Sequence, residues 1–360
     1  MKGIGTDYLI LDKERGIWVE NPEQKVRDDV EKHYWRTVGR TILKDWRLYL
    51  MLIPMLLVFL FWRYFPMYEL LGSFKVVDSV KSVSEQYSMG FSNFKALLLG
   101  TGTFASTSQN FWQALRNTFV LSFYGLCFGF PMPIILALFF NEIRSNAARS
   151  VYQVLTYLPK FMSTVIMTSL VIMLLRMQSE TAQMGVVARA LAGLHIVPEA
   201  DAMSGLLKQP QYFRAIYQIS GIWETAGYDS IVFFAAIIAI SPTSYEAAQI
   251  DGAGKWSQMR YVVLPSILST IVIMLITRIG SMLSIGYEKV MLLTEGAGNE
   301  VKTTAQVIST FSWDLKSADS AGARASGLAS AAEMMNNVVG MLLVIGSNTI
   351  ARKASNVSLY

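Results

Sequence analysis

The chain has 360 residues, of which 52% are hydrophobic and 16% charged, with a mean hydropathy of +0.37. Because a soluble domain carries about a quarter charged residues, this composition indicates a membrane protein. One cysteine and two histidines exclude a disulfide framework and a Cys-based metal cluster, and argue against a His-rich metal site. The net charge of +5 fits basic residues that flank membrane helices, and no basic, aromatic-interleaved stretch indicates nucleic-acid binding.

The N-terminal segment 1–47 is polar and of mixed charge, without the apolar core and small-residue cleavage site of a signal peptide. Ten Lys and Arg residues precede Leu48, which places this segment in the cytoplasm by the positive-inside rule. Residues 26–46 predict an amphipathic helix on the membrane surface, or else a tail that packs on a partner subunit.

Apolar runs close to the roughly 20 residues that a helix needs to cross a bilayer recur along the chain. They predict an all-α polytopic membrane protein whose membrane domain covers residues 48–353, followed by a cytoplasmic tail, 354–360. The six expected spans are 48–65, 118–140, 154–175, 216–240, 264–283 and 333–350.

An even number of spans puts both termini in the cytoplasm, together with the connection between spans four and five. The longer segments 67–117, 176–215 and 286–332 then face outward. Within the last of these, the small residues from Ser320 to Gly327 predict a loop.

The connection 241–265 predicts two short helices around a turn. Ser241 is a candidate N-cap with Pro242 in the first turn, and Thr243 and Glu246 have capping-box spacing. After the turn, a second helix is expected from Lys255 to Leu264.

The turn itself is predicted at Gly252, because a left-handed C-terminal stop strains a residue that has a Cβ. Pro265 is expected to open span five. The connection would therefore form a rigid elbow between two membrane helices.

A family resemblance becomes specific here. The connection resembles the EAA motif of binding-protein-dependent ABC permeases. In it, Glu-Ala-Ala is followed after three residues by Gly, after nine more by an aliphatic residue, and after one more by Leu-Pro. The matching positions are Glu246, Ala247, Ala248, Gly252, Val262, Leu264 and Pro265, with Val262 where the family usually has Ile. The fuller string from Glu246 to Trp256 resembles the carbohydrate-importing branch.

Several other strings after residue 45 are similar to LplB-type polysaccharide permeases. They include Leu50–Pro54, Tyr64–Tyr68, Ala137–Glu142, Tyr157–Pro159, Arg278–Gly280 and Tyr287–Lys289. Two departures are Lys160, where His is expected, and the Gly-rich and Ala-rich stretch after Leu293. The substrate is therefore less firmly implied than the fold.

The resemblance implies the type I ABC importer permease fold with a cytoplasmic coupling elbow, in the bacterial inner membrane. It implies a transporter subunit without catalytic residues, paired with a second permease, two ATP-binding subunits and an external solute-binding protein that delivers an oligosaccharide. ATP and Mg²⁺ would be bound by the ATPase partners, because the sequence lacks G-x-x-x-x-G-K-[ST]. The implied ATPase-coupling residues are Glu246, Ala247, Ala248, Asp251, Gly252, Leu264 and Pro265.

Charged residues inside spans are costly and are therefore candidates for the substrate pathway. Glu224 follows Trp223 in span four, with Tyr228 one turn further, and Arg278 lies in span five. Aromatic rings stack on sugar rings and polar groups bind their hydroxyls, so this set suits a sugar. Arg278 could pair with Glu224 or with an acidic substrate. A structural ion pair, or a position near the outer interface, would explain the same residues.

Lys160 follows Pro159 and is a candidate for the lining of the pathway, but snorkelling to the interface is the favoured expectation. Three other functions stay open. A permease for a non-sugar solute would share the elbow. A secondary transporter would lack it and would show repeats or broken helices around its site. A membrane enzyme would need a cluster of catalytic polar residues, which the sequence does not display.

Overall fold

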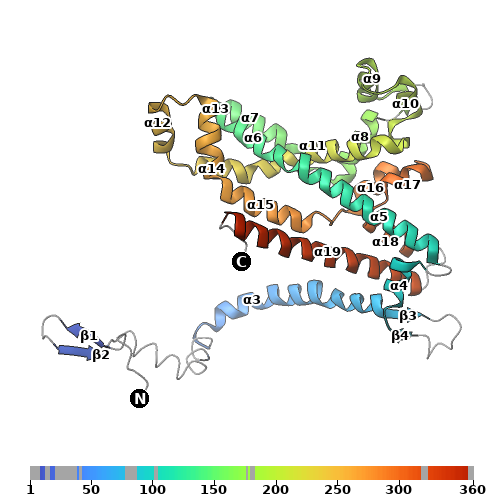
Figure 1. Ribbon diagram of the computed structural model, residues 1–360, viewed down its shortest axis with the longest axis horizontal. Helices are drawn as coiled ribbons and strands as arrows, with labels where there is room; N and C mark the ends of the chain where they lie inside the picture. Colours follow the sequence, from blue (N-terminus) through green and yellow to red (C-terminus); the bar gives the residue numbers. More distant parts are fainter. Residues whose placement is uncertain are drawn as a thin grey trace. The chain divides into compact units, whose positions relative to one another are not determined.

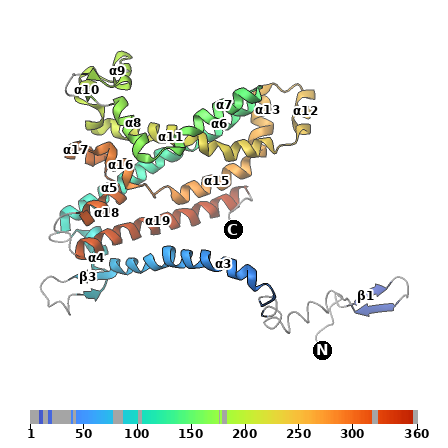
Figure 2. The same ribbon diagram turned by 180° about the vertical axis from the view of Figure 1, so that it is seen from behind.

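The computed structural model (Figures 1 and 2) describes residues 9–12, 17–20, 39, 43–77, 87–100, 104–175, 177–178, 183–317 and 323–355. The chain divides into two compact units, Met1–Tyr68 and Glu69–Tyr360, and each is described by itself. Helices dominate both, which confirms the predicted all-α class. The described residues also form three two-stranded antiparallel hairpins. They are β1 (Leu9–Asp12) with β2 (Ile17–Glu20), β3 (Lys75–Val77) with β4 (Tyr87–Met89), and β5 (Met177–Gln178) with β6 (Gln183–Met184).

The described residues of the first unit contain one candidate membrane span. Helix α3 (Trp46–Phe59) continues as a π-helical turn, Leu60–Tyr64, and the 19 residues are long and apolar enough to cross a membrane. No residue of α3 is buried, as expected of a surface that faces lipid. The predicted first span is confirmed. The amphipathic helix predicted over residues 26–46 lies mostly outside the described residues.

The second predicted span is part of a longer helix. Helix α5 (Ala105–Tyr124), a π-helical turn (Gly125–Gly129) and α6 (Pro131–Glu142) form one span of 38 residues. Its first third is too polar to be found as an apolar run, but it buries Phe111 and Ala114. These side chains pack against α4 (Ser92–Leu99) and α18 (Ile308–Ser317). Tertiary packing therefore lengthens this helix.

The third predicted span is wrong as a single helix. Helix α7 (Asn146–Tyr157) ends in a 3₁₀ turn, Leu158–Phe161, and α8 (Thr164–Leu175) leaves at 102°. Pro159 has no N–H to continue the α-helical hydrogen bonds. The Ser163 hydroxyl accepts a hydrogen bond from the Ile166 N–H at 3.3 Å, which supports the new start.

The predicted spans four and six are confirmed and are longer than expected. Helix α11 (Pro210–Ile238) has 29 residues, and α19 (Ala323–Ser355) has 33. The predicted loop from Ser320 to Gly327 is wrong from Ala323 onward, because alanine favours helix and buried small residues let α19 pack closely on α18. Residues 318–322 lie outside the described part.

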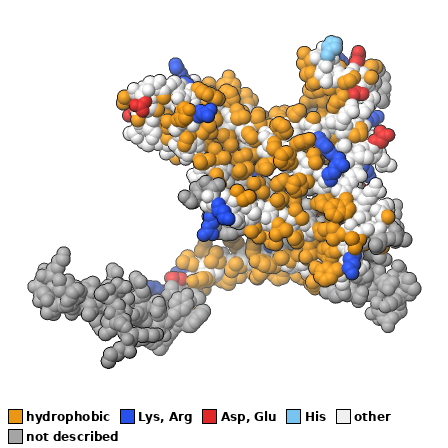
Figure 3. Space-filling view, in the orientation of Figure 1, with side chains coloured by type: hydrophobic (Ala, Val, Ile, Leu, Met, Phe, Trp, Pro, Cys, Tyr) orange, Lys and Arg blue, Asp and Glu red, His pale blue; other side chains and the backbone are white. Residues whose placement is uncertain are grey.

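Short helices complete the second unit. They are α9 (Val186–Gly193), α10 (Glu199–Ser204), the 3₁₀ helices Phe65–Phe74 (which starts in the first unit) and Leu206–Lys208, α16 (Tyr287–Thr294) and α17 (Asn299–Ala305). Span five is α15 (Leu268–Ser281), which follows α12 (Pro242–Ile250), α13 (Lys255–Gln258) and α14 (Leu264–Ser266). Figure 3 shows hydrophobic side chains spread over much of the visible face of this unit.

Helix α11 is central to the second unit and packs on α6, α7 and α17. Gly227 permits the contact with α7, since a Cβ there would collide with the backbone carbonyl of Thr156 and lie 3.0 Å from its Cβ. A glycine inside a membrane helix thus allows two backbones to approach closely.

Replacing Gly227 by alanine is expected to destabilise the protein by about 1–3 kcal/mol, because the α7–α11 contact has no room for a methyl group. Gly346→Ala in α19 is the matched control, since nothing lies within 4 Å of its Cβ position. Thermal unfolding of the purified variants in detergent measures both effects. Equal midpoints for Gly227→Ala and the unsubstituted protein would contradict the close packing.

Candidate functional site

The predicted elbow is present between α11 and α15. Helix α12 is followed by a turn, then by α13, a π-helical turn (Met259–Val263) and α14. Figures 1 and 2 show α12 and α13 at the end of the second unit away from α17 and α18. The elbow thus projects from one end of the helices that it joins.

Gly252 closes the first half of the elbow as predicted. Its φ is +77°, in the left-handed region, and nothing lies within 4 Å of where its Cβ would be. The Ala253 N–H donates to the Ala248 carbonyl at 2.8 Å, and the Gly252 N–H donates to the Gln249 carbonyl at 3.0 Å. These two bonds are the Schellman pattern that ends a helix. Glycine is needed for conformation here, because space is not limiting.

Ser241 occupies the N-cap position of α12 as predicted, but it does not cap the helix with its side chain. The Ser241 side chain makes no capping hydrogen bond, and its hydroxyl instead lies 2.7 Å from that of Thr243. Because α12 begins at Pro242, Thr243 is already inside the helix and cannot form a capping box with Glu246. The exposed start of α12 leaves its first N–H groups open to water.

Pro265 does not open span five. The helix runs through Pro265 to Ser266, and the 62° bend lies at Ile267, before α15. The π-helical turn just before Pro265 widens the backbone where the proline ring would meet a carbonyl. Ile267 itself is 1% exposed, in a cluster with Phe233 and Val263. The bend is therefore fixed by core packing.

Side chains tie the elbow to the end of α6. The Lys255 ammonium lies 3.1 Å from the Glu142 carboxylate, and the Tyr245 side chain is hydrogen-bonded to Asn141. Burial raises the pKa of Tyr245 above its ordinary value. Within the elbow, the Gln258 amide donates to the Ala253 carbonyl at 2.8 Å. A force on the elbow would therefore reach α6 as well as α15.

The elbow also exposes large apolar side chains that the sequence analysis overlooked. Ile250, Trp256 and Tyr261 are 87%, 72% and 71% exposed. Glu246 and Asp251 are exposed as well. Exposed apolar residues on a polar end of a membrane protein are typical of a protein-binding surface. The sequence signal that could have identified this surface is a Trp in a polar loop that contains Gly.

A second candidate site is a cavity of about 410 Å³ between α11 and its neighbours. Glu224 and Arg278 line it, as does Lys160, which was expected to snorkel. The other described residues of its lining are Gly129, Thr164, Tyr217, Gln218, Gly221, Ile222, Thr225, Ser284, Gly286, Glu288 and Lys289. We call it the central cavity.

Glu224 pairs with Lys289, in place of the partner considered from the sequence, Arg278. The Lys289 ammonium lies 3.0 Å from the Glu224 carboxylate, with the two side chains 13% and 14% exposed. It also lies 5.5 Å from the centre of the Tyr217 ring. Lys289 belongs to α16, and the sequence alone gives no means of placing α16 against α11.

Other charges meet nearby. Arg278 and Lys160 both interact electrostatically with Asp229 of α11, whose side chain is hydrogen-bonded to Thr225. Asp229 was overlooked in the sequence analysis. The central cavity thus offers hydroxyl, amide and charged groups of both signs.

Trp223 and Tyr228 are not among the described residues that line the central cavity. They are 45% and 43% exposed, and the Tyr228 ring meets Phe161 edge-on at 6.0 Å. Neighbouring residues of a helix point about 100° apart, so Trp223 does not share the face of Glu224. A role of either residue in transport stays a prediction.

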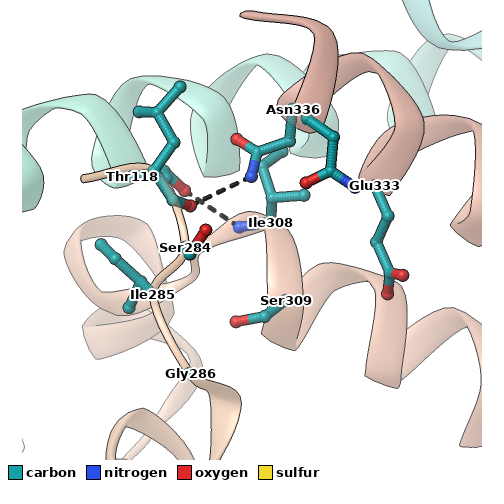
Figure 4. A pocket seen from close by; sticks show the side chains of 10 residues that line it. Thr118, Ser284, Ile285, Gly286, Ile308, Ser309, Glu333 and Asn336 are labelled. Carbon is teal, nitrogen blue, oxygen red and sulfur yellow. Dashed lines mark hydrogen bonds between the residues drawn. The ribbon is translucent and has the colours of Figure 1, made fainter. Parts of the chain in front are cut away.

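A smaller cavity of about 290 Å³ lies among α5, α18, α19 and the link between α15 and α16 (Figure 4). We call it the second cavity. In Figure 4 the side chains of Thr118, Ser309 and Asn336 surround it. Its full described lining is Thr118, Leu283, Ser284, Ile285, Gly286, Ile308, Ser309, Glu333, Asn336 and Asn337.

Replacing Lys289 by methionine is expected to destabilise the protein by about 3 kcal/mol, because Glu224 would stay buried without its partner. The double variant Glu224→Gln/Lys289→Met should regain most of this loss, since it carries no unpaired charge. Thermal unfolding measures both changes.

The matched control is Lys302→Met in the exposed pair of Lys302 with Asp314, whose side chains are 54% and 45% exposed. This change should cost less than about 1 kcal/mol. Equal losses of stability for Lys289→Met and Lys302→Met would show that the buried pair contributes no more to stability than the exposed pair.

Comparison with known proteins agrees with this architecture. The chain is 32% identical over 317 residues to Protein LplB of Bacillus subtilis (strain 168), covering 88% of this chain and 92% of the relative. It is 34% identical over 315 residues to the polygalacturonan/rhamnogalacturonan transport system permease protein YteP of the same organism, covering 87% and 90%.

The fold is also similar to a crystal structure of a bacterial ABC transporter involved in the import of the acidic polysaccharide alginate. The TM-score is 0.73 at 37% identity, over 89% of this chain and 99% of the other. A second structure of the bacterial alginate ABC transporter, in complex with an alginate pentasaccharide-bound periplasmic protein, matches with the same TM-score at 36% identity.

Residues 129–314, more than half of the chain, match the family model "Binding-protein-dependent transport system inner membrane component". This region includes the elbow, the central cavity and the bent spans. The chain is a multi-pass membrane protein and belongs to the family of inner membrane permease components of binding-protein-dependent ABC importers.

Proposed function

We propose that the chain forms half of the translocation pathway of an ATP-driven importer for oligosaccharides in the bacterial inner membrane. It would pair with a second permease, receive its sugar from an external solute-binding protein and contact one of two ATP-binding subunits through the elbow. ATP and Mg²⁺ would be bound by those subunits and not by this chain.

The anchoring of the elbow carries this proposal. A partner that binds Ile250, Trp256 and Tyr261 would hold the exposed side of the elbow. Its displacement would reach α15 through the backbone that passes the bend at Ile267, and α6 through Lys255 and Glu142. To move an alternating-access equilibrium from 1:99 to 99:1, ATP binding must favour one state by about 5.5 kcal/mol.

The charge distribution supports the orientation. If each bent helix pair counts as one crossing, the described residues contain six spans, and the termini would share a side with the elbow. Ten basic residues before Leu48 favour the cytoplasm for that side, by the positive-inside rule. An ATPase in the cytoplasm could then reach the elbow.

The central cavity supports a sugar as the substrate. Its hydroxyl, amide and charged groups provide both donors and acceptors, as a ring with many hydroxyls requires. The names of similar proteins also support a sugar substrate. One relative is named for polygalacturonan and rhamnogalacturonan transport, and a solved neighbour is involved in the import of alginate. Oligosaccharides of uronic acids are therefore the first substrates to test, with neutral oligosaccharides beside them.

Replacing Gly252 by leucine is expected to abolish uptake while membrane insertion stays intact. A side chain at φ +77° strains the turn by about 1–2 kcal/mol. The changed turn would move α12 out of the position in which it contacts the ATPase. The measurement is ATP-dependent uptake of labelled uronate and neutral oligosaccharides by vesicles that contain the assembled importer.

Gly254→Ala is the matched control, because Gly254 has a φ of −69° and open space around its Cβ position. It should transport normally. Normal uptake by Gly252→Leu would overturn the coupling role of the elbow.

A further inference from the structure

The second cavity adjoins the central cavity. Ser284 and Gly286 line both, so the link between α15 and α16 is a wall that the two cavities share. A linear molecule longer than one sugar ring could therefore contact both spaces. The central cavity alone does not explain the polar groups on the far side of this wall.

Two residues that line the second cavity each carry a buried polar atom without a partner among the described residues. Asn336 is 9% exposed, and its amide nitrogen donates to the Leu283 carbonyl at 3.0 Å, but its Oδ1 atom accepts no hydrogen bond. The hydroxyl of Ser309 is unpaired as well. Each such atom costs about 1–3 kcal/mol if nothing satisfies it. Their presence at a cavity indicates a ligand or water that supplies hydrogen bonds.

An exposed aromatic pair lies beside these atoms. The Tyr287 and Trp313 rings stack with their centres 4.9 Å apart and their planes 7° apart, and the residues are 43% and 41% exposed. Tyr287 follows Gly286 in the wall, and Trp313 is one helical turn after Ser309 on α18.

The chemistry of this place matches a sugar better than water alone. Aromatic faces stack on the apolar face of a pyranose, and unpaired acceptors and hydroxyls bind its hydroxyl groups. Glu333 adds a carboxylate to the lining and lies 3.9 Å from the Lys316 ammonium, so its charge is balanced. The described lining thus combines polar groups with apolar residues and holds no isolated charge.

We propose that the second cavity, with Tyr287 and Trp313 at its side, is a second carbohydrate subsite. It would bind a further sugar residue of the same oligosaccharide whose other end occupies the central cavity. This proposal rests on the proposed function of oligosaccharide import. It predicts that the importer distinguishes substrates by chain length.

The test uses the assembled importer in vesicles, with the solute-binding protein and the ATPase subunits present. Initial uptake rates are measured for oligogalacturonides and neutral oligosaccharides of two, three and four residues. Ser309→Ala and Trp313→Ala are compared with the unsubstituted chain. Ser317→Ala is the matched control, because Ser317 is exposed about two turns further along α18.

Both test variants are expected to raise the KM for tetrasaccharides about tenfold, since each loses roughly one hydrogen bond or stacking contact. The effect should shrink with chain length and be smallest for disaccharides. Ser317→Ala should match the unsubstituted chain. Ser309→Ala should not lower the thermal midpoint, because its hydroxyl supports no other group among the described residues.

The failures can be told apart. Equal losses at every chain length, or a lowered midpoint in Ser309→Ala, would overturn the second subsite and leave the proposed function intact. If the unsubstituted importer takes up none of these saccharides, oligosaccharide import fails and the subsite fails with it.

Discussion

Peptide groups inside hydrocarbon must bond within the protein, because lipid offers no partners. The long helices α5–α6, α11 and α19 satisfy this constraint along their length. Several departures from helix lie where a proline is accommodated or a side chain bonds the backbone. Pro131 and Pro265 each follow a π-helical turn, and Ser163 caps the helix that begins after the bend at Pro159. The membrane domain therefore bends at fixed positions.

The elbow depends on the same constraint. Because the helix continues through Pro265, the exposed α12–α13 region connects by backbone to the buried bend at Ile267. Lys255 provides a second connection, through Glu142, to α6. In the proposed mechanism a partner moves two spans by displacing one exposed segment. The left-handed turn at Gly252 sets the direction in which that segment points.

The sequence predicts features that depend on local chemistry. Apolar runs locate the spans, and the turn at Gly252 follows from the backbone freedom of glycine. Pro159 and Pro265 show the limit, since one accompanies a 102° bend and the other lies inside a helix. Whether a proline breaks a helix depends on the backbone and packing around it, which the sequence does not state.

Features that join distant segments were not predictable. The partner of Glu224 is Lys289, 65 residues further along the chain, and the sequence suggested Arg278 because it lies within a span. The second cavity likewise combines residues of α5, α18 and α19. Trp223 seemed paired with Glu224 by adjacency, but a helix turns neighbours apart. Such sites require the tertiary structure.

The central claim is that an ATP-driven partner moves this chain. The most direct test is oligosaccharide uptake by vesicles that contain the assembled importer, with ionophores present to collapse ion gradients. The account predicts that uptake continues under these conditions and stops when ATP is withheld. Uptake that needs an ion gradient and proceeds without ATP or the ATPase subunits would contradict it.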